Sequence, residues 1–362
     1  MPKASQDMPP LPQLLCLAYG GVRPEFSAPP RCSGAVATVC GQVRIGSGAQ
    51  LGEDAVVRGD GHEIRIGTDF FLGERSSVHV AHERLPTLIG NNVTVGRHAV
   101  LRACRVGDGC VLEDRVTVLD DAQLGAGCVI EGNSVVPGGA VLEGGTLYRG
   151  TPARAVRRLE PGELLRLRGR VRNAAAREGD AQEAPRRAPQ ATADQGFLAL
   201  TAQVEGALRM ASDAGVWFGA RLDGGSQGIR VGDGSSLHDN CQAHAISRPL
   251  EIGAGVTVEH NVALHDCRIG DRALIGASSF LNAGTVVEDD VILQAGSLTL
   301  PHQVLHGGWS WGGRPARALA PLSEQDRLRI ADSARIWRGY AAGFRDSFAQ
   351  FVADRDLGDR PA

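Results

Sequence analysis

The chain has 362 residues, with 38 basic and 41 acidic side chains and a net charge of -3. So balanced a charge gives no electrostatic case for nucleic-acid binding, and no run of about 18 apolar residues is present to span a membrane. Glycine occurs 48 times and aromatic residues make up 4%, which favours many short strands and tight turns over a helical bundle.

Residues 1–33 are predicted to be an N-terminal tail and lead-in. Their one apolar piece, LLCLA, is short and follows prolines, so it is not interpreted as a signal peptide. The eight cysteines of the chain include no CxxC pair. Isolated cysteines of this kind usually serve as small buried apolar side chains in proteins of a reducing compartment. We therefore predict a cytoplasmic protein.

An apolar–glycine pattern with a period of about six residues begins near residue 34 and includes VRIGSGAQLGEDAVV and TLIGNNVTVG. Each unit has an aliphatic residue, a small residue and four mostly polar positions. Hexapeptide repeats of this kind stack as a left-handed parallel β-helix, with the aliphatic residues in inward columns. We therefore predict a β-dominated domain over residues 34–177 that ends in a helix rich in Leu and Arg.

Residues 178–196 are charged and rich in Ala and Pro, as expected of a linker. The repeat then begins again: IRIG at Ile64 matches IRVG at Ile229, and LRAC at Leu101 matches LHDC at Leu264. We predict a second β-helix with its own C-terminal helix over residues 197–350, with Ser323 as the N-cap of that helix and residues 351–362 as a frayed tail.

Three histidines of the second copy, His244, His260 and His265, form a candidate metal site. Three neutral imidazoles are the ligand set of a catalytic zinc that keeps its fourth position open. His244 and His265 are 21 residues apart, about one coil plus a short loop, so they are expected to stack on neighbouring coils. His260 lies five residues before His265, out of register, and is expected to point elsewhere. The three histidines of one chain would therefore struggle to converge on one ion.

Both copies resemble the γ-class carbonic anhydrase family, a branch of the trimeric hexapeptide-repeat proteins. The resemblance rests on VVRGD and IRIG in the first copy, and on IRVG, His244 and VTVEHNVALHDC in the second. It implies that His244, His260 and His265 bind Zn²⁺, with Fe²⁺ or Co²⁺ as alternatives. It also implies a homotrimer in which His244 and His265 of one chain meet His260 of the next, so that metal sites are shared between chains.

The first copy departs from the family pattern. His79 keeps the first ligand position, but Arg97 and Arg102 occupy the other two, and guanidinium groups do not ligate metals. We therefore predict that the first domain is metal-free. His98 lies one residue from a ligand position and is expected to face elsewhere.

The second copy has lost two accessory features of the family. Arg58 and Asp60 of the RGD motif become Asp223 and Gly225, and a Gln-Asp pair that orients the hydroxide becomes His238-Asp239. His238 is a candidate proton relay or general base, and Asp239 a candidate hydrogen-bond partner of a ligand histidine or of the metal-bound water. The alternatives are a surface histidine and an ordinary turn residue.

The leading functional prediction is a γ-carbonic-anhydrase-like metalloenzyme, a lyase or a metal-dependent hydrolase. Its metal-bound hydroxide would attack CO2 or another small carbonyl or acyl-thioester substrate, with the site in the second domain. The predicted partners are thus small molecules (CO2, bicarbonate or an acyl compound), with no nucleic acid and no membrane. Two alternatives stay open: a hexapeptide acyltransferase, and a non-catalytic oligomeric scaffold with a structural metal.

Overall fold

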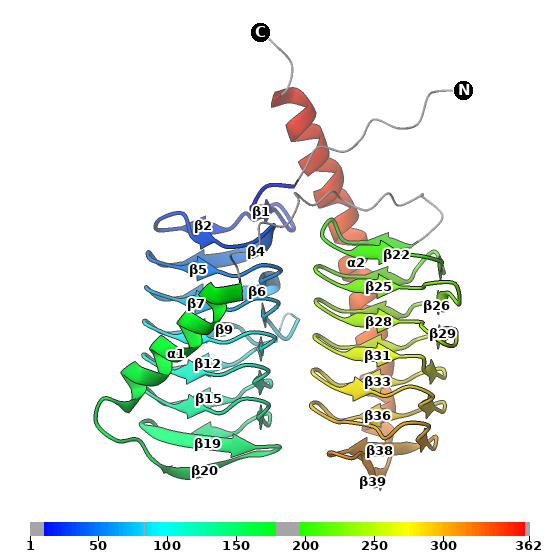
Figure 1. Ribbon diagram of the computed structural model, residues 1–362. Coiled ribbons are helices and arrows are strands. Elements are labelled where there is room, and N and C mark those ends of the chain that lie inside the picture. Colours follow the sequence, from blue (N-terminus) through cyan, green and yellow to red (C-terminus); the bar gives the residue numbers. More distant parts are fainter. Residues whose placement is uncertain (1–10, 83, 179–195, 359–362) are drawn as a thin grey trace.

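The computed structural model of the protein describes residues 11–82, 84–178 and 196–358. Two left-handed parallel β-helices stand side by side, and each is followed by a helix, α1 (Glu163–Glu178) after the first and α2 (Glu324–Gly358) after the second (Figure 1). We call the β-helices the first and second solenoid. The predicted fold class, two tandem β-helices with C-terminal helices, is confirmed. Most of the predicted linker, residues 179–195, lies outside the described residues.

The strands of the first solenoid form two sheets that wrap around its core. One sheet contains, in spatial order, β17 (Val135–Val136), β14 (Thr117–Val118), β11 (Val100–Arg102), β8 (Ser77–His79), β6 (Val56–Ile66), β9 (Thr87–Ile89), β12 (Arg105–Val106), β15 (Gln123–Leu124) and β18 (Val141–Leu142), with β4 (Ala37–Ile45) joining β6 to β1 (Leu14–Leu17) and β2 (Glu25–Phe26). The other contains β20 (Ala153–Arg158), β19 (Thr146–Gly150), β16 (Val129–Ile130), β13 (Val111–Leu112), β10 (Thr94–Val95), β7 (Phe71–Leu72), β5 (Gln50–Leu51) and β3 (Arg31–Cys32). Both sheets are parallel except for the edge strand β20, which is antiparallel to β19.

The second solenoid has three sheets, one for each side of its triangular coil. The first contains β21 (Phe197–Leu198), β24 (Gly215–Val216), β27 (Ser236–Leu237), β30 (Thr257–Val258), β33 (Leu274–Ile275), β36 (Ile292–Leu293), β38 (Trp309–Gly312) and β39 (Arg317–Pro321). The second contains β22 (Gln203–Glu205), β25 (Arg221–Asp223), β28 (Gln242–His244), β31 (Ala263–His265) and β34 (Phe280–Leu281). The third contains β23 (Leu208–Met210), β26 (Ile229–Val231), β29 (Leu250–Ile252), β32 (Arg268–Ile269), β35 (Val286–Val287) and β37 (Val304–Leu305).

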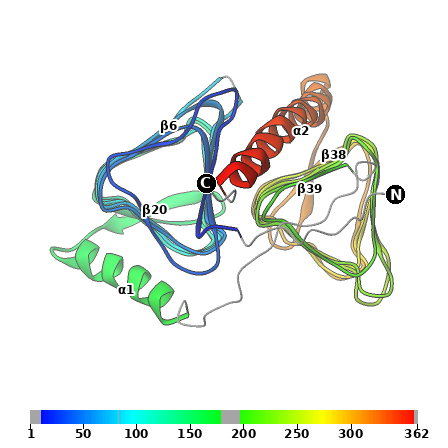
Figure 2. The same cartoon turned by 90° about the horizontal axis from the view of Figure 1, so that it is seen from above.

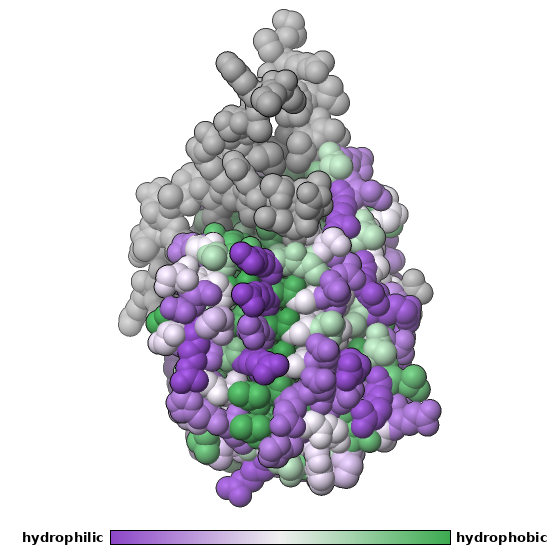
Figure 3. Space-filling view, turned by 90° about the vertical axis from the view of Figure 1, so that its right-hand side faces the viewer, coloured by the Kyte–Doolittle hydropathy of each residue, from purple (hydrophilic) through white to green (hydrophobic). Residues whose placement is uncertain are grey.

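The core of each coil is a column of aliphatic side chains in register. In the first solenoid Leu72, Val95, Leu112 and Ile130 occupy equivalent places on paired strands, and all are fully buried. Burying one such side chain contributes roughly 1.5–3 kcal/mol. The outward side of the third sheet of the second solenoid is hydrophilic in its upper coils and more apolar in its lower ones (Figure 3).

Helix α2 lies along the groove between the two solenoids, whose triangular cross-sections are seen end-on in Figure 2. The predicted N-cap is confirmed, because Ser323 Oγ accepts a hydrogen bond of 3.1 Å from the backbone N–H of Asp326. Ile330 and Ala334 are buried, and α2 contacts β24, β27 and β30 as well as β1 of the first solenoid. One hydrophobic cluster therefore joins the helix to both solenoids.

The ends of the ordered structure differ from the predicted boundaries. Strand β1 lies in the segment predicted as a tail, because Leu15 and Leu17 are buried on β4 and beneath α2. Helix α2 continues to Gly358, into the predicted frayed tail. Among the described residues, no helix has both the length and the apolar character needed to cross a membrane.

Candidate metal site between the two solenoids

The contact between the solenoids brings a strand ladder of the first against corners of the second. Arg58, His79 and Arg102 lie side by side on the paired strands β6, β8 and β11. Asp239 and His260 each lie two residues beyond the end of a short strand, β27 and β30, where the chain turns a corner. These two corners face the ladder, so side chains about 160 to 180 residues apart in the sequence meet in one site.

A buried ion-pair network anchors this contact. Arg58 Nη1 donates hydrogen bonds of 3.1 Å to both carboxylate oxygens of Asp239, and Arg58 Nε donates one of 2.9 Å to Asp60. The guanidinium carbon lies 4.2 Å from the ring centroid of Trp217, an aromatic contact that favours a cation. Burial tends to raise the pKa of Asp239, but Arg58 and the neighbouring histidines hold that pKa well below its ordinary value. Asp239 is therefore an ionised carboxylate.

Two histidines from different solenoids share this carboxylate. The rings of His79 and His260 are stacked with centroids 3.9 Å apart, and both are almost completely buried. His79 Nε2 lies 2.8 Å and His260 Nδ1 3.4 Å from Asp239 Oδ2. The donor atoms of these three residues all lie within 4.8 Å of one another. Burial, and then the neighbouring His260, lower the pKa of His79 to about 3, so its imidazole is neutral.

The three donor atoms fit a divalent metal ion. Within the described part of the chain, His79 Nε2 and His260 Nδ1 have no hydrogen-bond partner of suitable angle, although both lie close to Asp239. A buried nitrogen left in this way is costly, and a cation between the three atoms would remove the cost. Two carboxylates, those of Asp60 and Asp239, also face the single guanidinium of Arg58, and burial raises the pKa of Asp60. Two imidazoles and a carboxylate are a known ligand set of catalytic zinc.

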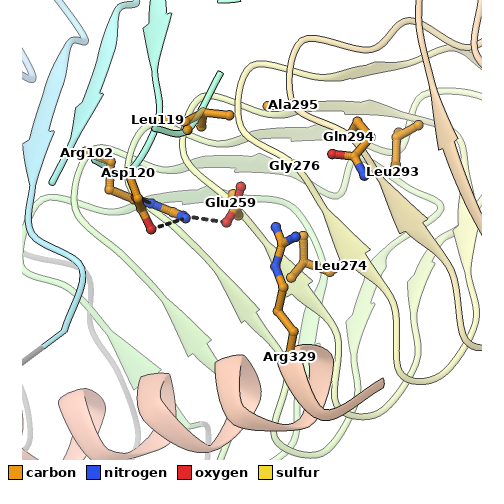
Figure 4. Close-up of a pocket in the computed structure, with 11 residues that line it drawn as sticks. Arg102, Leu119, Asp120, Glu259, Leu274, Gly276, Leu293, Gln294, Ala295 and Arg329 are labelled. Carbon is orange, nitrogen blue, oxygen red and sulfur yellow. Dashed lines mark hydrogen bonds and ion pairs between the residues drawn. The ribbon is translucent and has the colours of Figure 1, made fainter. Parts of the chain in front are cut away.

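The third ligand position of the family is closed by an ion pair between the solenoids. Arg102 donates a 2.6 Å hydrogen bond to Glu259 of the second solenoid and pairs with Asp120 of the first through Nη2 at 3.0 Å. Figure 4 shows this chain of contacts, with Arg329 of α2 extending toward Glu259. Burial tends to raise the pKa of Glu259, but Arg102 and Arg329 lower it. Arg102 therefore holds the solenoids together where a ligand histidine would stand.

A cleft of about 700 Å³ leads from the solvent to the paired histidines. Its walls include His79 and His260, the Arg102–Glu259 ion pair, and side chains of α2 such as Trp337 and Tyr340. At its rim His82 Nδ1 lies 2.8 Å from the hydroxyl of Tyr340. The cleft therefore brings the solvent to the edge of the candidate metal site.

The structure separates the histidines that the sequence analysis grouped. His244 and His265 pair in register on β28 and β31 with ring centroids 5.1 Å apart, as expected of neighbouring coils. His260 is buried on a different side of the second solenoid, against His79. Within one chain His260 thus meets the first solenoid, and the predicted set of His244, His260 and His265 requires a second polypeptide.

His238, the candidate proton relay, is buried rather than exposed. Its ring is stacked on Trp337 at 3.5 Å, and Ser236 Oγ lies 3.1 Å from its Nε2. Burial, followed by the effect of His260, lowers its pKa well below the ordinary value, so it is neutral. Asp239 does contact a predicted ligand histidine, His260 of the second solenoid, and it also contacts His79 of the first.

Sequence reasoning missed the part that the first solenoid and α2 play in this site. His79 was set aside because its two partner positions hold arginines. The RGD motif is the signal that could have revealed the role of the first copy. Arg58 and Asp60 are kept only in the first copy, and the aspartate that pairs with Arg58, Asp239, is kept only in the second. No sequence pattern indicates that Trp337 of α2 covers His238.

Comparison with known proteins identifies the family. The model for bacterial transferase hexapeptide (six repeats) matches residues 103–138, and that for the hexapeptide repeat of succinyl-transferase matches residues 267–298. A probable carbonic anhydrase of Methanocaldococcus jannaschii is 38% identical over 128 residues, 35% of this chain and 80% of that protein. Protein YrdA of Escherichia coli is 35% identical over 139 residues, 36% of this chain and 76% of the relative. The chain belongs to the γ-carbonic-anhydrase-like hexapeptide-repeat family.

Other similarities concern part of the relative or the fold alone. The mitochondrial γ carbonic anhydrase 2 of Arabidopsis thaliana is 31% identical over 172 residues, 44% of this chain and 62% of that protein. The chain therefore spans about three fifths of the length of that member of the γ-carbonic-anhydrase-like family. A putative acetyltransferase of Desulfovibrio desulfuricans has a TM-score of 0.53 at 13% identity, covering 91% of this chain and 82% of the other, which is a likeness of fold.

Proposed function

We propose that this protein is a metal-dependent enzyme with carbonic-anhydrase-like chemistry, and that its metal lies between the two solenoids on His79, His260 and Asp239. The observation that carries the proposal is the convergence of these three donor atoms within 4.8 Å. When bound at three protein ligands, a divalent metal such as zinc supplies hydroxide at neutral pH by lowering the pKa of its water to about 7.

The surrounding residues would prepare the site for a small electrophile. Arg58 keeps Asp239 ionised and fixed, and Trp337 and Tyr340 wall the cleft on the side of α2. CO2 or another small carbonyl compound, including an acyl thioester, fits an opening that is lined by the imidazoles of His79 and His260. His82 at the rim is better placed than the buried His238 to pass a proton to solvent.

Metal analysis of the purified full chain, with matched histidine variants, tests this placement. His79→Ala and His260→Ala should each reduce bound zinc from about one per chain to near zero, because three ligands are the minimum for such a site. His306→Ala, at an exposed histidine, should leave the zinc bound. Retention of zinc by both His79→Ala and His260→Ala would refute the proposed placement.

A second candidate is the metal site predicted from the sequence, with His244 and His265 joined by a third imidazole from another domain. It is favoured by the stacking of these two rings on adjacent strands. In this case His265→Ala should remove the metal, while His79→Ala should not.

Activity measurements separate the remaining functional classes. Stopped-flow CO2 hydration and a thioester-hydrolysis assay on the metal-loaded chain distinguish the two carbonyl chemistries. Acetyl transfer from acetyl-coenzyme A without any metal would instead support the acyltransferase alternative. Bound metal with no turnover in any of these assays would support the scaffold alternative, in which the metal is structural.

A further inference from the structure

A second cleft lies between the two solenoids, apart from the three ligands of the proposed metal site. Its volume is about 410 Å³, within the roughly 300–1,000 Å³ of small-molecule sites. None of His79, Asp239 and His260 lines it, and no described residue of α2 does so. A molecule in the second cleft would therefore contact residues that the proposed reaction at these three ligands does not use.

Two arginines, one from each solenoid, line the second cleft. Arg115 lies at a corner of the first solenoid, between β13 and β14, and Arg314 lies between β38 and β39 of the second. Burial, and then the charge of Arg115, lower the pKa of Arg314. Since guanidinium groups stay protonated in proteins, two interacting positive charges from different solenoids border one cleft.

No carboxylate neutralises these two charges. Elsewhere at the corners of the first solenoid, Arg97 pairs with Asp114 at 2.8 Å. By contrast, Arg115 and Arg314 form no ion pair with any carboxylate of the described residues, and the residues that line the second cleft include no Asp or Glu. Like charges brought together without a counter-ion repel each other. An anion between the two arginines would replace this repulsion by two attractions.

The polar groups of the second cleft are hydrogen-bond donors suited to an anion. Arg314 Nε donates a hydrogen bond of 2.6 Å to the backbone oxygen of Gly296, which holds the guanidinium in place. Asn133 of the first solenoid and Gln242 of the second add one side-chain amide each, and neither amide has a hydrogen-bond partner in the described chain. Each solenoid thus contributes one guanidinium and one amide. A guanidinium matches the two oxygens of a carboxylate or phosphate.

One wall of the second cleft is apolar. It includes Ala263, Phe280 and Leu298. Ala263 and Phe280 pair in register on β31 and β34, and Phe280 forms a backbone bridge with Leu298. The side chain of Phe280 is 37% exposed. An exposed aromatic ring beside two cations fits a molecule that is charged at one end and apolar at the other.

We infer that the second cleft binds a small organic anion, with its carboxylate or phosphate group between Arg115 and Arg314 and its apolar part against Phe280. Carboxylate and phosphate present the same kind of oxygen acceptors to a guanidinium, so the cleft recognises chemistry that both groups share. The bound anion would also connect the solenoids, which a hydrogen bond of 2.7 Å between Thr117 Oγ1 and Ser278 Oγ already joins beside the cleft. The inference does not depend on the proposed metal.

Four small molecules test this inference on the purified full-length chain. Benzoate and phenyl phosphate combine a charged group with an apolar ring, whereas inorganic phosphate lacks the ring and benzyl alcohol lacks the charge. Ligand-detected NMR at constant ionic strength should show binding of benzoate, phenyl phosphate or both. Inorganic phosphate and benzyl alcohol should bind about tenfold more weakly or worse, because each lacks one of the two sets of contacts. The tighter of the two organic anions identifies the charged group that the cleft prefers.

Matched variants locate the bound anion. Arg115→Ala and Arg314→Ala should each weaken its binding by about tenfold or more, since each removes charge-assisted hydrogen bonds. Phe280→Ala should weaken it as well. Arg105→Ala is the control, because it removes an exposed arginine of β12 that does not line the second cleft, and the affinity should stay unchanged. Arg105, Arg115 and Arg314 are all exposed, so these three truncations should leave the fold intact, which thermal unfolding verifies.

The anion result is separable from the proposed metal chemistry. Binding should be the same before and after bound metal is removed by dialysis against a chelator and then against buffer. The inference is overturned if neither organic anion binds, if binding is lost with the metal, or if inorganic phosphate or benzyl alcohol binds as tightly as the organic anions. It is also overturned if Arg105→Ala weakens binding as much as Arg115→Ala and Arg314→Ala. The zinc content of His79→Ala bears on the proposed function alone.

Discussion

The ring of His260, from the second solenoid, stacks on the ring of His79, from the first, with centroids 3.9 Å apart. Their nitrogens converge on one carboxylate oxygen of Asp239, which Arg58 holds from the other side. Duplication of the domain has thus placed inside one chain a contact between two different faces. The two copies have diverged so that Arg102 closes the third ligand position.

Replacing Arg102 by histidine should restore that third imidazole. An added ligand contributes about 3 kcal/mol if the 10–16 kcal/mol of four-ligand zinc sites is shared equally, so zinc or cobalt should bind the Arg102→His variant more than tenfold tighter. Cobalt absorption and competition with a chelator measure this affinity. Arg97→His is the control, because Arg97 pairs with Asp114 and does not line the cleft that contains His79 and His260. An equal gain in that variant would contradict the prediction.

Removal of the Arg58 side chain should destabilise the fold strongly. Arg58→Ala leaves Asp60 and Asp239 buried without their cation, which costs about 3–5 kcal/mol in comparable networks. Guanidinium unfolding of the variant measures the loss. Arg44→Ala removes an exposed ion pair with Glu25 and should cost less than about 1 kcal/mol. A similar loss of stability in both variants would contradict the prediction that the buried network contributes more than an exposed ion pair.

Trp337 should be the main attachment of α2 over the site. Its ring stacks on His238 at 3.5 Å and lies 5.0 Å from the guanidinium carbon of Arg58. Trp337→Ala should lower the free energy of unfolding by about 3 kcal/mol, as for other large aromatic truncations. Trp309→Ala, at an exposed tryptophan, should change it by less than about 1 kcal/mol. Thermal and chemical unfolding of the two variants measure these changes, and an equal loss of stability in both would contradict the prediction.

His98 should make stability fall in mild acid. Burial, followed by Arg75, Arg115 and Arg97, lowers its pKa from 6.5 to about 4. The unfolded chain therefore takes up a proton at this residue as the pH falls below 6.5, while the folded chain does not until about pH 4. Stability is lost through that window, by less than about 1.4 kcal/mol per pH unit.

The matched variant for this pH effect is His98→Asn. His98 has a φ of 54°, in the left-handed region, and asparagine tolerates it, as Asn261 does at the equivalent corner with a φ of 57°. Unfolding titrations between pH 7 and 4 should show a shallower loss of stability for the variant than for the parent chain. Parallel curves would contradict the assignment.

The fold could be predicted because the hexapeptide pattern is local. An aliphatic residue in every hexad, with small residues beside it, leads directly to columns such as Leu72, Val95 and Leu112. The same local reasoning predicted that His244 and His265 would stack. The N-terminal strand β1 was not predicted, because Leu15 and Leu17 are buried by β4 and α2. The sequence of the N-terminal segment alone does not indicate these contacts.

The composition of the site between the solenoids could not be predicted for a different reason. It depends on which face of the first solenoid meets which face of the second. Sequence spacing places His79 on a strand and His260 near a corner, but it does not bring the two together. The sequence analysis therefore expected His260 to meet histidines of another chain, whereas in the structure it meets His79 of the same chain.

The covalent link between the solenoids changes how the paired histidines respond to dilution. In separate subunits such a site disappears when the protein concentration falls below the dissociation constant of the oligomer. Here both halves belong to one polypeptide, so their effective concentration is set by the tether, on the order of millimolar for short flexible linkers. His79 and His260 should therefore remain together at any cellular abundance.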